Sequence, residues 1–353
     1  MVHPAAGNSL RRGQSSRGDW EPMHEGLRSQ SSALLRTIRQ EGLAVGVETV
    51  RRYLTYRLYR RFQINGGLLL REVQGSKMYL DVNDKGMSRD LAIRGVREPI
   101  HTKIIKRELE EGMVVVDIGA NIGYYVLVEA LAVGHKGRVY AIEPSPRSFA
   151  LLKRNIEVNG FSDVVQAYNM AISDRSGKAR LYLSERWNLQ SMLHPEEFLS
   201  AYHEVDRYVE VVTTTLDGFL GDKKPVDLMR MDVEGYEIEV FDGMVDTLRS
   251  GNSPREILFE THPSRYTPNH RLKPRLEMLL SCGYEPKDIW VDDGVRGQGL
   301  IGSSGEPEVV TRAGESEASY NVSKASWDDF IKLECPPNPQ DAIHHYVLLQ
   351  KQG

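Results

Sequence analysis

Two acidic residues, each at the end of a short apolar segment, stand on either side of a glycine-rich turn. Asp117 follows one β-branched run, Glu143 follows the next apolar run, and Gly119 and Gly123 lie between them. Short apolar runs bounded by glycine are typical of buried strands in a parallel sheet. A strand, a tight turn and a helix place free N–H groups and a positive dipole end at the carboxyl edge of such a sheet. The pattern therefore predicts a nucleotide-type pocket.

The spacing of the turn indicates which nucleotide this pocket binds. Its glycines follow the pattern G-x-x-x-G and lack the G-x-G-x-x-G of dinucleotide-binding proteins. The carboxylate of Asp117 would repel phosphates at close range, so it suits a cationic ligand better. Asn121 offers a side-chain oxygen that could cap the following helix. We therefore expect a sulfonium cofactor with an α-amino group, which is S-adenosyl-L-methionine.

Glu143 predicts the contact with the ribose of this cofactor. It lies 20 residues after Gly123, the distance at which an acid at the tip of the second strand of a βαβ unit accepts hydrogen bonds from both ribose hydroxyls. A single acid there would be weak evidence, whereas two acids with two glycines between them favour S-adenosyl-L-methionine over an ordinary α/β turn.

Other residues are expected to border the same pocket. Glu98 lies upstream of the turn and could fold over the cofactor. Asn169 and Ala171 follow the third predicted strand, where residues usually flank the adenine of such cofactors. A polar loop is expected to contact substrate, because long loops over a pocket often do so. That loop contains Trp187, Asn188, Gln190 and Ser191.

Ionisable residues also follow the fourth and fifth predicted strands. Asp232 and Glu234 come after the fourth strand, and Glu260 and His262 after the fifth. Because parallel strands end at the same edge of a sheet, we expect these side chains to share one rim of the pocket. A hydroxyl acceptor needs a base to remove its proton. His262 is our first choice, with an expected pKa of about 6.5. Asp232 is the second choice, and Glu234 and Glu260 are further candidates for this role.

The elements that must position these residues alternate between strands and helices, which predicts an α/β fold with a doubly wound parallel sheet. The expected helices span residues 89–94, 99–109, 146–159 and 275–280. The expected strands end near residues 116, 142, 170, 231, 259, 291 and 350, and the last is expected to be antiparallel. Two hairpins are expected, at residues 68–82 and 178–215.

Composition divides the chain into four parts. Residues 1–32 are polar and predict a disordered tail, residues 33–62 a basic amphipathic helix, and residues 63–111 a hairpin with helices. Residues 112–353 form the predicted cofactor-binding domain, in which the glycine-, serine- and glutamate-rich segment 292–325 is expected to be a mobile loop.

The basic helix has two interpretations. Arginines alternate with tyrosines between Arg51 and Arg61, which is compatible with peripheral contact to an anionic membrane or another polyanion. The simpler interpretation, which we prefer, is the solvated face of a helix that docks on the core.

Charge and cysteine content exclude several classes of protein. The chain has 353 residues, a net charge of −4 and two cysteines, Cys282 and Cys335. This balance gives no reason to expect nucleic acid as a partner, and two cysteines make no disulfide framework. No segment reaches the roughly 18 apolar residues of a membrane span. We expect a cytoplasmic protein, assign no metal site, and leave its oligomeric state open.

With these residues assembled, the chain from Glu98 onward resembles the FkbM-type S-adenosylmethionine-dependent methyltransferases. The resemblance rests on the D-x-G-x-N-x-G loop at Asp117, on Glu143 and Pro144, and on the run Asp232, Val233, Glu234, Gly235 with Glu237. Leu152 and Asn155 also match. One departure is Arg230, where the family usually has lysine.

The resemblance implies a Rossmann-like, seven-stranded methyltransferase sheet with an antiparallel last strand. It implies that Glu143 binds the ribose, that Asp232 lies at the active-site rim, and that the first loop holds the methionine part of the cofactor. The residues of that loop are Asp117, Gly119, Asn121, Gly123 and Tyr124. The implied activity is O-methylation of a hydroxyl on a sugar, glycan or natural-product-like small molecule.

Three alternatives stay open at this point. A nucleic-acid or other N-methyltransferase would commonly show an N-P-P-Y-like run after the fourth strand, where this chain has Asp232, Val233, Glu234 and Gly235. A non-catalytic adaptor that binds a membrane or polyanion could keep the same fold. A nicotinamide dehydrogenase is the third alternative.

Overall fold

The computed structural model describes residues 43–194, 203–221, 223, 225–250, 253–267, 269–291, 306–312, 315–321 and 345–352. The predicted tail at residues 1–32 and the first ten residues of the predicted basic helix lie outside the described residues. The rest of that helix is α2, Leu43–Phe62.

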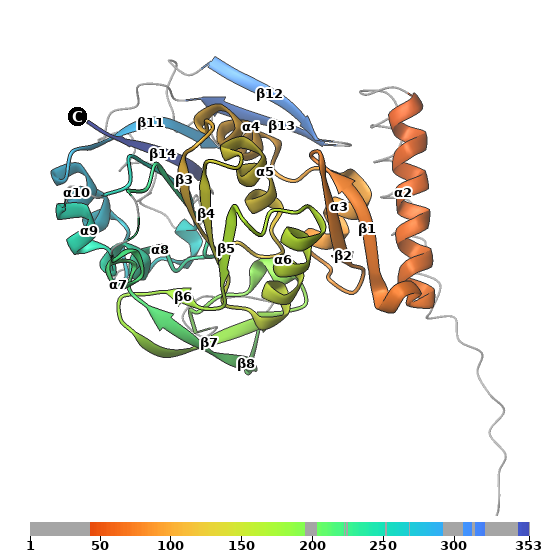
Figure 1. Cartoon of the computed structure of the whole chain (residues 1–353), viewed down its shortest axis with the longest axis horizontal. Coiled ribbons are helices and arrows are strands. Elements are labelled where there is room, and N and C mark those ends of the chain that lie inside the picture. The colour runs from red at the N-terminus through yellow and green to blue at the C-terminus, as the bar shows by residue number, and fades with distance from the viewer. Residues whose placement is uncertain are drawn as a thin grey trace, which may run out of the picture.

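The centre of the molecule is a nine-stranded sheet in the order β12-β13-β11-β14-β10-β9-β3-β4-β5 (Figure 1). Strands β3, β4, β5, β9 and β10 run parallel, whereas β14 is antiparallel to both β10 and β11. The seven strands from β11 to β5 are therefore the predicted doubly wound sheet with an antiparallel last strand. Their bounds are Val114–Ile118 (β3), Arg138–Ile142 (β4), Val165–Tyr168 (β5), Leu228–Met231 (β9), Glu256–Thr261 (β10), Tyr284–Val291 (β11) and His345–Lys351 (β14).

Strands β12 and β13 correct the prediction of a mobile loop at residues 292–325. β12, Glu306–Arg312, pairs with β13, Glu315–Asn321, and β13 pairs with the end of β11. The pairing extends the sheet at one edge. The prediction was wrong for these two segments because strand pairing uses backbone groups, which a glycine-, serine- and glutamate-rich composition does not reveal.

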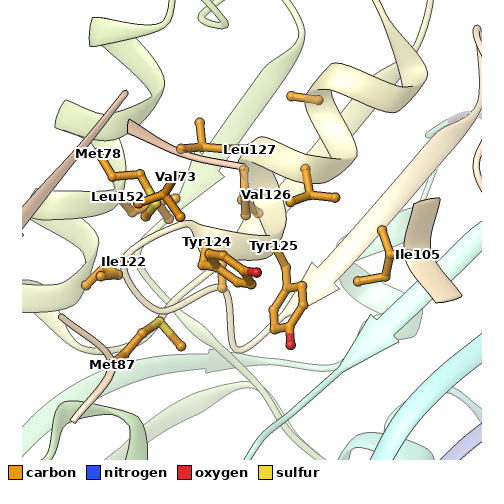
Figure 2. Close-up of a cluster of buried hydrophobic side chains, with 14 of the residues drawn as sticks. Val73, Met78, Met87, Ile105, Ile122, Tyr124, Tyr125, Val126, Leu127 and Leu152 are labelled. Atoms are coloured by element: carbon orange, nitrogen blue, oxygen red, sulfur yellow. The ribbon is translucent and has the colours of Figure 1, made fainter. Parts of the chain in front are cut away.

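Helices cover both faces of the sheet, because successive residues of each strand point to opposite faces. In β3, Val115 packs into one core, whereas Val114, Val116 and Ile118 pack into the other. The first core contains the helices α4 (Pro99–Glu108), α5 (Tyr124–Val133) and α6 (Pro146–Val158) and is drawn in part in Figure 2. The second core contains α7 (Leu216–Leu220), α8 (Glu237–Asp242), α9 (Val245–Arg249) and α10 (Lys273–Ser281).

The part before β3 contributes side chains to the first core, and Figure 2 shows Val73, Met78 and Met87 among them. The predicted hairpin is present as β1, Leu68–Val73, and β2, Ser76–Asp81, and the helix α3 spans Met87–Arg94. The side chain of Asn155 in α6 bonds the backbone of Tyr79 in both directions, at 2.7 and 3.2 Å. The hairpin is thus tied to α6 and forms a sheet of its own.

Helix α2 lies at the outer side of this part (Figure 1). Tyr56 is buried and bonds the carbonyl of Val82, so one side of the helix is docked as the simpler interpretation predicts. On the other side, Leu54, Leu58 and Phe62 are more than half exposed. Contact of this exposed side with an anionic membrane stays a prediction. In the described ranges no helix combines the length and the apolar character that crossing a bilayer requires.

A second small sheet follows β5 in the chain. It has the order β6-β8-β7, with the bounds Ala171–Ile172 (β6), His203–Thr214 (β8) and Gly177–Ser184 (β7). The antiparallel pair β7 and β8 is the second predicted hairpin. The short helix at Trp187–Leu189 lies in the segment between these two strands.

Candidate active site

A cleft opens where the predicted sheet strands end. Its floor is made by residues that follow β3, β4 and β9, namely Gly119, Asn121, Glu143, Asp232 and Glu234. Its other wall comes from the small sheet and its loop, with Leu181, Trp187 and Met192. The cleft encloses about 660 Å³, its open side included.

Gly119 permits the close approach of two loops in the floor. It has a φ of +87°, and a Cβ at this position would lie 1.9 Å from the carbonyl oxygen of Asp232. The loop after β9 is held there because the N–H of Asp232 donates to the carbonyl of Ile118 at 3.0 Å. A side chain at position 119 would push the two strand ends apart.

Asn121 does not cap the following helix. Helix α5 begins at Tyr124 and its N-cap is Gly123, which has a φ of +92°. The side-chain oxygen of Asn121 instead accepts the N–H of Ile122 at 2.8 Å. The capping prediction was wrong because Asn121 itself has a left-handed backbone, with a φ of 51°, and lies in the turn before the helix.

Glu143 lies in the cleft floor, at the position expected for a ribose contact. Its two carboxylate oxygens accept the N–H groups of Asn121 and Ser145, each at 2.8 Å. Burial raises the pKa of Glu143 to about 7, although these two N–H groups act in the opposite direction. Each carboxylate oxygen keeps a second lone pair. Glu143 can therefore still accept hydrogen bonds from a diol.

The remaining cleft walls also fit S-adenosyl-L-methionine. Ile142, Ile172 and Trp187 supply apolar surface on which a purine can lie. Among the described residues, the side-chain oxygens of Asn188 and Gln190 are buried without a hydrogen-bond partner. Both residues line the cleft, and their oxygens would suit donors such as an exocyclic amine. The placement agrees with the expectation that the polar loop faces ligand.

Arg230 lies beneath the floor and joins two acids. One guanidinium nitrogen bonds Asp117 at 2.7 Å, and another bonds Asp232 at 3.1 Å. The guanidinium carbon lies 4.0 Å from the centre of the Tyr125 ring. Arginine can bridge two carboxylates and stack on a ring at once, whereas lysine offers a single point charge. Arg230, which stands where the family usually has lysine, therefore bridges Asp117 and Asp232 in a way that lysine would not reproduce.

Five predicted cofactor contacts do not line the cleft, namely Glu98, Asp117, Gly123, Tyr124 and Asn169. Asp117 is fully buried and engaged with Arg230, so it lies below the floor. The hydroxyl of Tyr124 is within hydrogen-bond distance of Thr102, at 3.0 Å, and the residue is buried in the first core. Asn169 donates to the backbone carbonyl of Glu143 at 2.9 Å and braces that loop from outside. Of the pair after the third strand, Ala171 lines the cleft.

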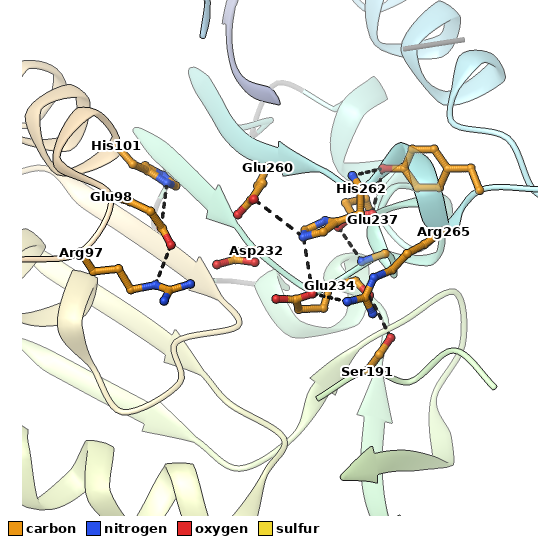
Figure 3. Close-up of polar contacts among 12 residues, drawn as sticks. Arg97, Glu98, His101, Ser191, Asp232, Glu234, Glu237, Glu260, His262 and Arg265 are labelled. Carbon is orange, nitrogen blue, oxygen red and sulfur yellow. Dashed lines mark hydrogen bonds and ion pairs between the residues drawn. The ribbon is translucent and has the colours of Figure 1, made fainter. Parts of the chain in front are cut away.

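Beyond the floor, the cleft adjoins a group of buried and partly buried charged side chains, which we call the acid cluster (Figure 3). It contains Glu98, Asp232, Glu234, Glu260 and His262. The ligand-type atoms of Asp232, Glu234 and His262 lie within 4.8 Å of one another, as do those of Glu98, Asp232 and Glu260. The strand tips of β9 and β10 therefore meet at one rim, as the sequence predicts.

His262 lies deepest in this cluster. Its Nδ1 is 2.8 Å from the carboxylate of Glu237, and its Nε2 lies 3.7 Å from Glu234 and 3.9 Å from Glu260. Burial disfavours the charged imidazole, but Glu237 and the two nearby carboxylates outweigh burial and raise the pKa of His262 to about 10. A histidine that is already protonated at neutral pH cannot accept a proton. The raised pKa therefore does not support His262 as the base, and that choice stays a prediction.

Glu234 lies at the cleft and has a pKa closer to neutral pH than that of His262. It lines the cleft, and its backbone is left-handed with a φ of 54°, which is rare for a residue with a Cβ. Arg265 holds its carboxylate at 2.5 Å and its carbonyl at 2.9 Å. Burial raises the pKa of Glu234 to about 7, against the attraction of His262 and Arg265. Burial also raises the pKa of Glu260 well above its usual value.

Glu98 reaches the cluster from the N-terminal side. It immediately precedes α4 in a left-handed conformation, with a φ of 41°, and its carboxylate bonds Arg97 at 2.6 Å and the hydroxyl of Tyr125 at 2.7 Å. Burial would raise its pKa, but Arg97 and other neighbours lower it to about 2. Glu98 therefore belongs to the acid cluster and does not line the cofactor cleft.

Comparison with known proteins decides what kind of site this is. Residues 117–286 match the family model of the methyltransferase FkbM domain. This part of the chain is a methyltransferase FkbM domain. The family and the class of enzyme implied by the sequence are confirmed. S-adenosyl-L-methionine is the methyl donor of FkbM methyltransferases and fits the cleft described above.

Three characterised relatives share part of the FkbM domain. The chain is 28% identical to methyltransferase sdnD of Sordaria araneosa, over 47% of this chain and 71% of sdnD. It is 28% identical to the hexuronic acid methyltransferase AglP of Haloferax volcanii, over 49% of this chain and 64% of AglP. It is 38% identical to the 31-O-demethyl-FK506 methyltransferase FkbM of Streptomyces tacrolimicus, over 25% of this chain and 33% of that protein. The chain thus spans less than two thirds of the last two relatives.

Several residues of the FkbM domain site escaped the sequence analysis. Met87 and Met192 line the cleft but stand alone in the sequence, without a pattern that marks them. Arg97 and Arg265 hold acids of the cluster, and only the fold brings them there. Glu237 was noticed as part of the family run, and its contact with His262 could have been suspected from the position of both residues after neighbouring strands.

Proposed function

We propose that the FkbM domain is an S-adenosyl-L-methionine-dependent O-methyltransferase that acts on a hydroxyl of a sugar, glycan or natural-product-like small molecule. The observation that carries this proposal is the shared position of Asp232 and Glu234. Both line the cofactor cleft, and both belong to the acid cluster beside it. An acceptor between cleft and cluster would have a carboxylate within reach of its proton.

Glu234 is the base in this proposal. A carboxylate with a pKa near the working pH is both ionised and able to accept a proton, which typically contributes about 10² to 10⁴-fold to rate. Arg265 fixes its orientation through two hydrogen bonds, and Ser191 donates to its carbonyl at 2.9 Å. The hydroxyl proton would pass to Glu234 as the oxygen attacks. Bound S-adenosyl-L-methionine would supply the electrophilic methyl group, with its S–CH₃ bond breaking to leave the thioether S-adenosyl-L-homocysteine.

His262 has an electrostatic role in this scheme. As a cation it lies between Glu237, Glu234 and Glu260, and it holds their charges together within the protein interior. Asp232 is held by Arg230 and lies between the cofactor floor and the cluster. Asp232 would therefore orient the acceptor and contribute less to proton transfer.

Two relatives support a hydroxyl-bearing acceptor. One is named for a hexuronic acid and the other for a 31-O-demethyl compound. The net charge of −4 and the acids around the site argue against a nucleic-acid acceptor, since phosphates would be repelled. A non-catalytic adaptor would have no need for the strained, buried carboxylate of Glu234.

The test is methyl transfer from methyl-labelled S-adenosyl-L-methionine to a panel of acceptors. The panel contains hexuronic acid glycans, polyketide alcohols and, as N-acceptors, amines and nucleic acids. We expect label in an O-methyl ether, identified by its NMR chemical shift, and loss of labelling in Glu234→Gln. Glu239→Gln is the matched control, because this glutamate on α8 pairs with His270 outside the site, at 2.6 Å. Label only on nitrogen would contradict the proposal, as would cofactor binding without turnover on any acceptor.

A further inference from the structure

The side of the acid cluster that faces away from Glu234 contains three carboxylates from three separate elements. Glu98 precedes α4, Asp232 follows β9, and Glu260 lies near the end of β10. One oxygen of each lies within 4.8 Å of one oxygen of the others. Their side chains are 7%, 17% and 15% exposed. Bringing three carboxylates this close inside a protein is costly unless a positive charge lies among them.

The basic residues nearby are already engaged in other contacts. Arg97 is bonded to Glu98 at 2.6 Å. Arg230 divides its charge between Asp232 and the buried Asp117. His262 bonds Glu237 at 2.8 Å and lies farther from Glu260, at 3.9 Å. Among the described residues, Arg97, Arg230 and His262 thus each have a contact outside the three carboxylates.

His101 is a second, independent observation at the same place. It is completely buried, and within the described part of the chain neither of its ring nitrogens has a hydrogen-bond partner. Its ring packs against Tyr125 and Tyr346, with centroids 4.7 and 4.6 Å away. Its Nδ1 lies 3.9 Å from Glu98, and Figure 3 shows the ring directed to that carboxylate. A buried imidazole without a partner indicates a missing polar ligand, because buried polar groups are normally satisfied.

We propose that Glu98, Asp232 and Glu260 hold a divalent cation of the Mg²⁺ and Mn²⁺ class, with His101 bonded to its water shell. Hard cations prefer oxygen ligands, and Mg²⁺ usually keeps several waters in its shell. Three carboxylates leave positions for water, and a coordinated water beside Glu98 would satisfy a ring nitrogen of His101. The cation would then balance the negative charges of the three acids from a position among them.

The cation would also offer the acceptor a specific binding partner. This consequence rests on the proposed function. Asp232 belongs both to the cation group and to the cleft wall. An oxygen-rich acceptor such as a sugar acid could then bind the cation through its oxygens, with its reactive hydroxyl near Glu234. Glu234 stays outside the three ligands, so proton transfer and cation binding involve different carboxylates.

Titration of chelator-treated, full-length protein with MnCl₂, followed by electron paramagnetic resonance and by calorimetry, tests the cation site. We expect one Mn²⁺ per chain, competed by MgCl₂, and at least tenfold weaker binding in Glu260→Gln. His101→Phe keeps the aromatic packing but removes both ring nitrogens, and it should weaken binding about threefold. Glu239→Gln, the matched control outside the group, should bind Mn²⁺ as the wild type does.

Two results would overturn the cation site. One is no Mn²⁺ binding by the wild-type protein at millimolar concentration, and the other is equal loss in Glu260→Gln and Glu239→Gln. A separate titration with S-adenosyl-L-methionine in the presence of chelator distinguishes failure of the cation site from failure of the proposed methyltransferase function. Cofactor binding and full methyl transfer without Mn²⁺ would leave the methyltransferase proposal standing and remove only the cation.

Discussion

The cofactor cleft and the acid cluster adjoin each other but hold their carboxylates by different means. Glu143 in the cleft is fixed by backbone N–H groups of Asn121 and Ser145, which lie in loops that directly follow β3 and β4. In the cluster, Glu234 is fixed by the side chain of Arg265, and Asp232 by that of Arg230. Backbone donors keep their positions when a side chain changes, whereas side-chain partners can be removed one at a time. The cleft should therefore tolerate substitution better than the cluster.

The largest effect is expected from removing the proposed base. Glu234→Gln should lower kcat by about 10² to 10⁴-fold, while the Kd of S-adenosyl-L-methionine changes little. At saturating cofactor, kcat of the wild type should rise with pH through a limb near 7, because Glu234 has a pKa of about 7 and must be ionised. Steady-state kinetics between pH 5 and 9 measure both quantities.

The same kinetics identify an alternative base. If Glu234→Gln keeps a near-normal kcat and the same pH limb, Glu234 is not the base. The role would then pass to Asp232 or Glu260. Glu239→Gln is again the control, since its partner His270 lies outside the cluster.

The contrast between the two regions also explains what the sequence could predict. Gly119, Glu143 and the order of strands follow from local patterns, since glycine spacing and apolar runs determine a strand and the loop after it. The convergence of Asp232, Glu234, Glu260 and His262 followed from the rule that parallel strands end at one edge. Those inferences needed no knowledge of individual side-chain contacts.

The sequence was least informative where a property depends on distant partners. Glu237, which lies 25 positions away, raises the pKa of His262, and this contact appears only after the sheet is assembled. Asp117 lies below the floor because Arg230, 113 positions away, pairs with it. Tyr124 follows the cofactor loop in the chain, yet the first turn of α5 directs it into the core. Charge state and direction of side chains could not be obtained from spacing.

A second prediction concerns the stability of the cluster. The pKa of His262 is raised from 6.5 to about 10, so the folded protein holds this proton more tightly than the unfolded chain. The resulting stabilisation is fully present below pH 6.5 and is lost as pH rises toward 10. Relative to His262→Gln, the wild type should lose on the order of 2–4 kcal/mol of unfolding free energy across this range.

Urea unfolding of both proteins with chelator present, at pH 6 and pH 10, measures this difference. The difference between the two proteins is informative because titrating groups remote from His262 contribute equally to both. A constant gap between wild type and variant over the whole range would mean that His262 is neutral, and it would restore histidine as a candidate base.

A third prediction tests the cleft. Glu143→Gln should weaken S-adenosyl-L-methionine binding by about 2 kcal/mol, roughly 30-fold in Kd, because the ribose loses charge-assisted hydrogen bonds. The loss should be largest at pH 8.5 and smaller at pH 6, since the pKa of Glu143 is about 7 and the wild-type carboxylate is protonated at the lower pH. Calorimetric titration gives both values. An unchanged Kd in a folded variant would contradict the ribose contact.

The smallest effect is expected at Arg230, which links the two regions through Asp117 and Asp232. Arg230→Lys keeps the positive charge but can reach only one acid at a time, and it loses the stack on Tyr125. We expect a loss of about 1 kcal/mol in unfolding free energy and less than a threefold change in the Kd of the cofactor. The change in kcat should exceed the change in Kd, because Asp232 belongs to the cluster while the cleft is held by backbone groups. Arg230→Met, which removes the charge, is the comparison variant and should destabilise the protein several times more, since it leaves Asp117 buried without a counter-charge. If Arg230→Lys instead weakens cofactor binding tenfold at unchanged kcat, the floor of the cleft depends on the same side-chain network as the cluster, and the distinction between the two regions fails.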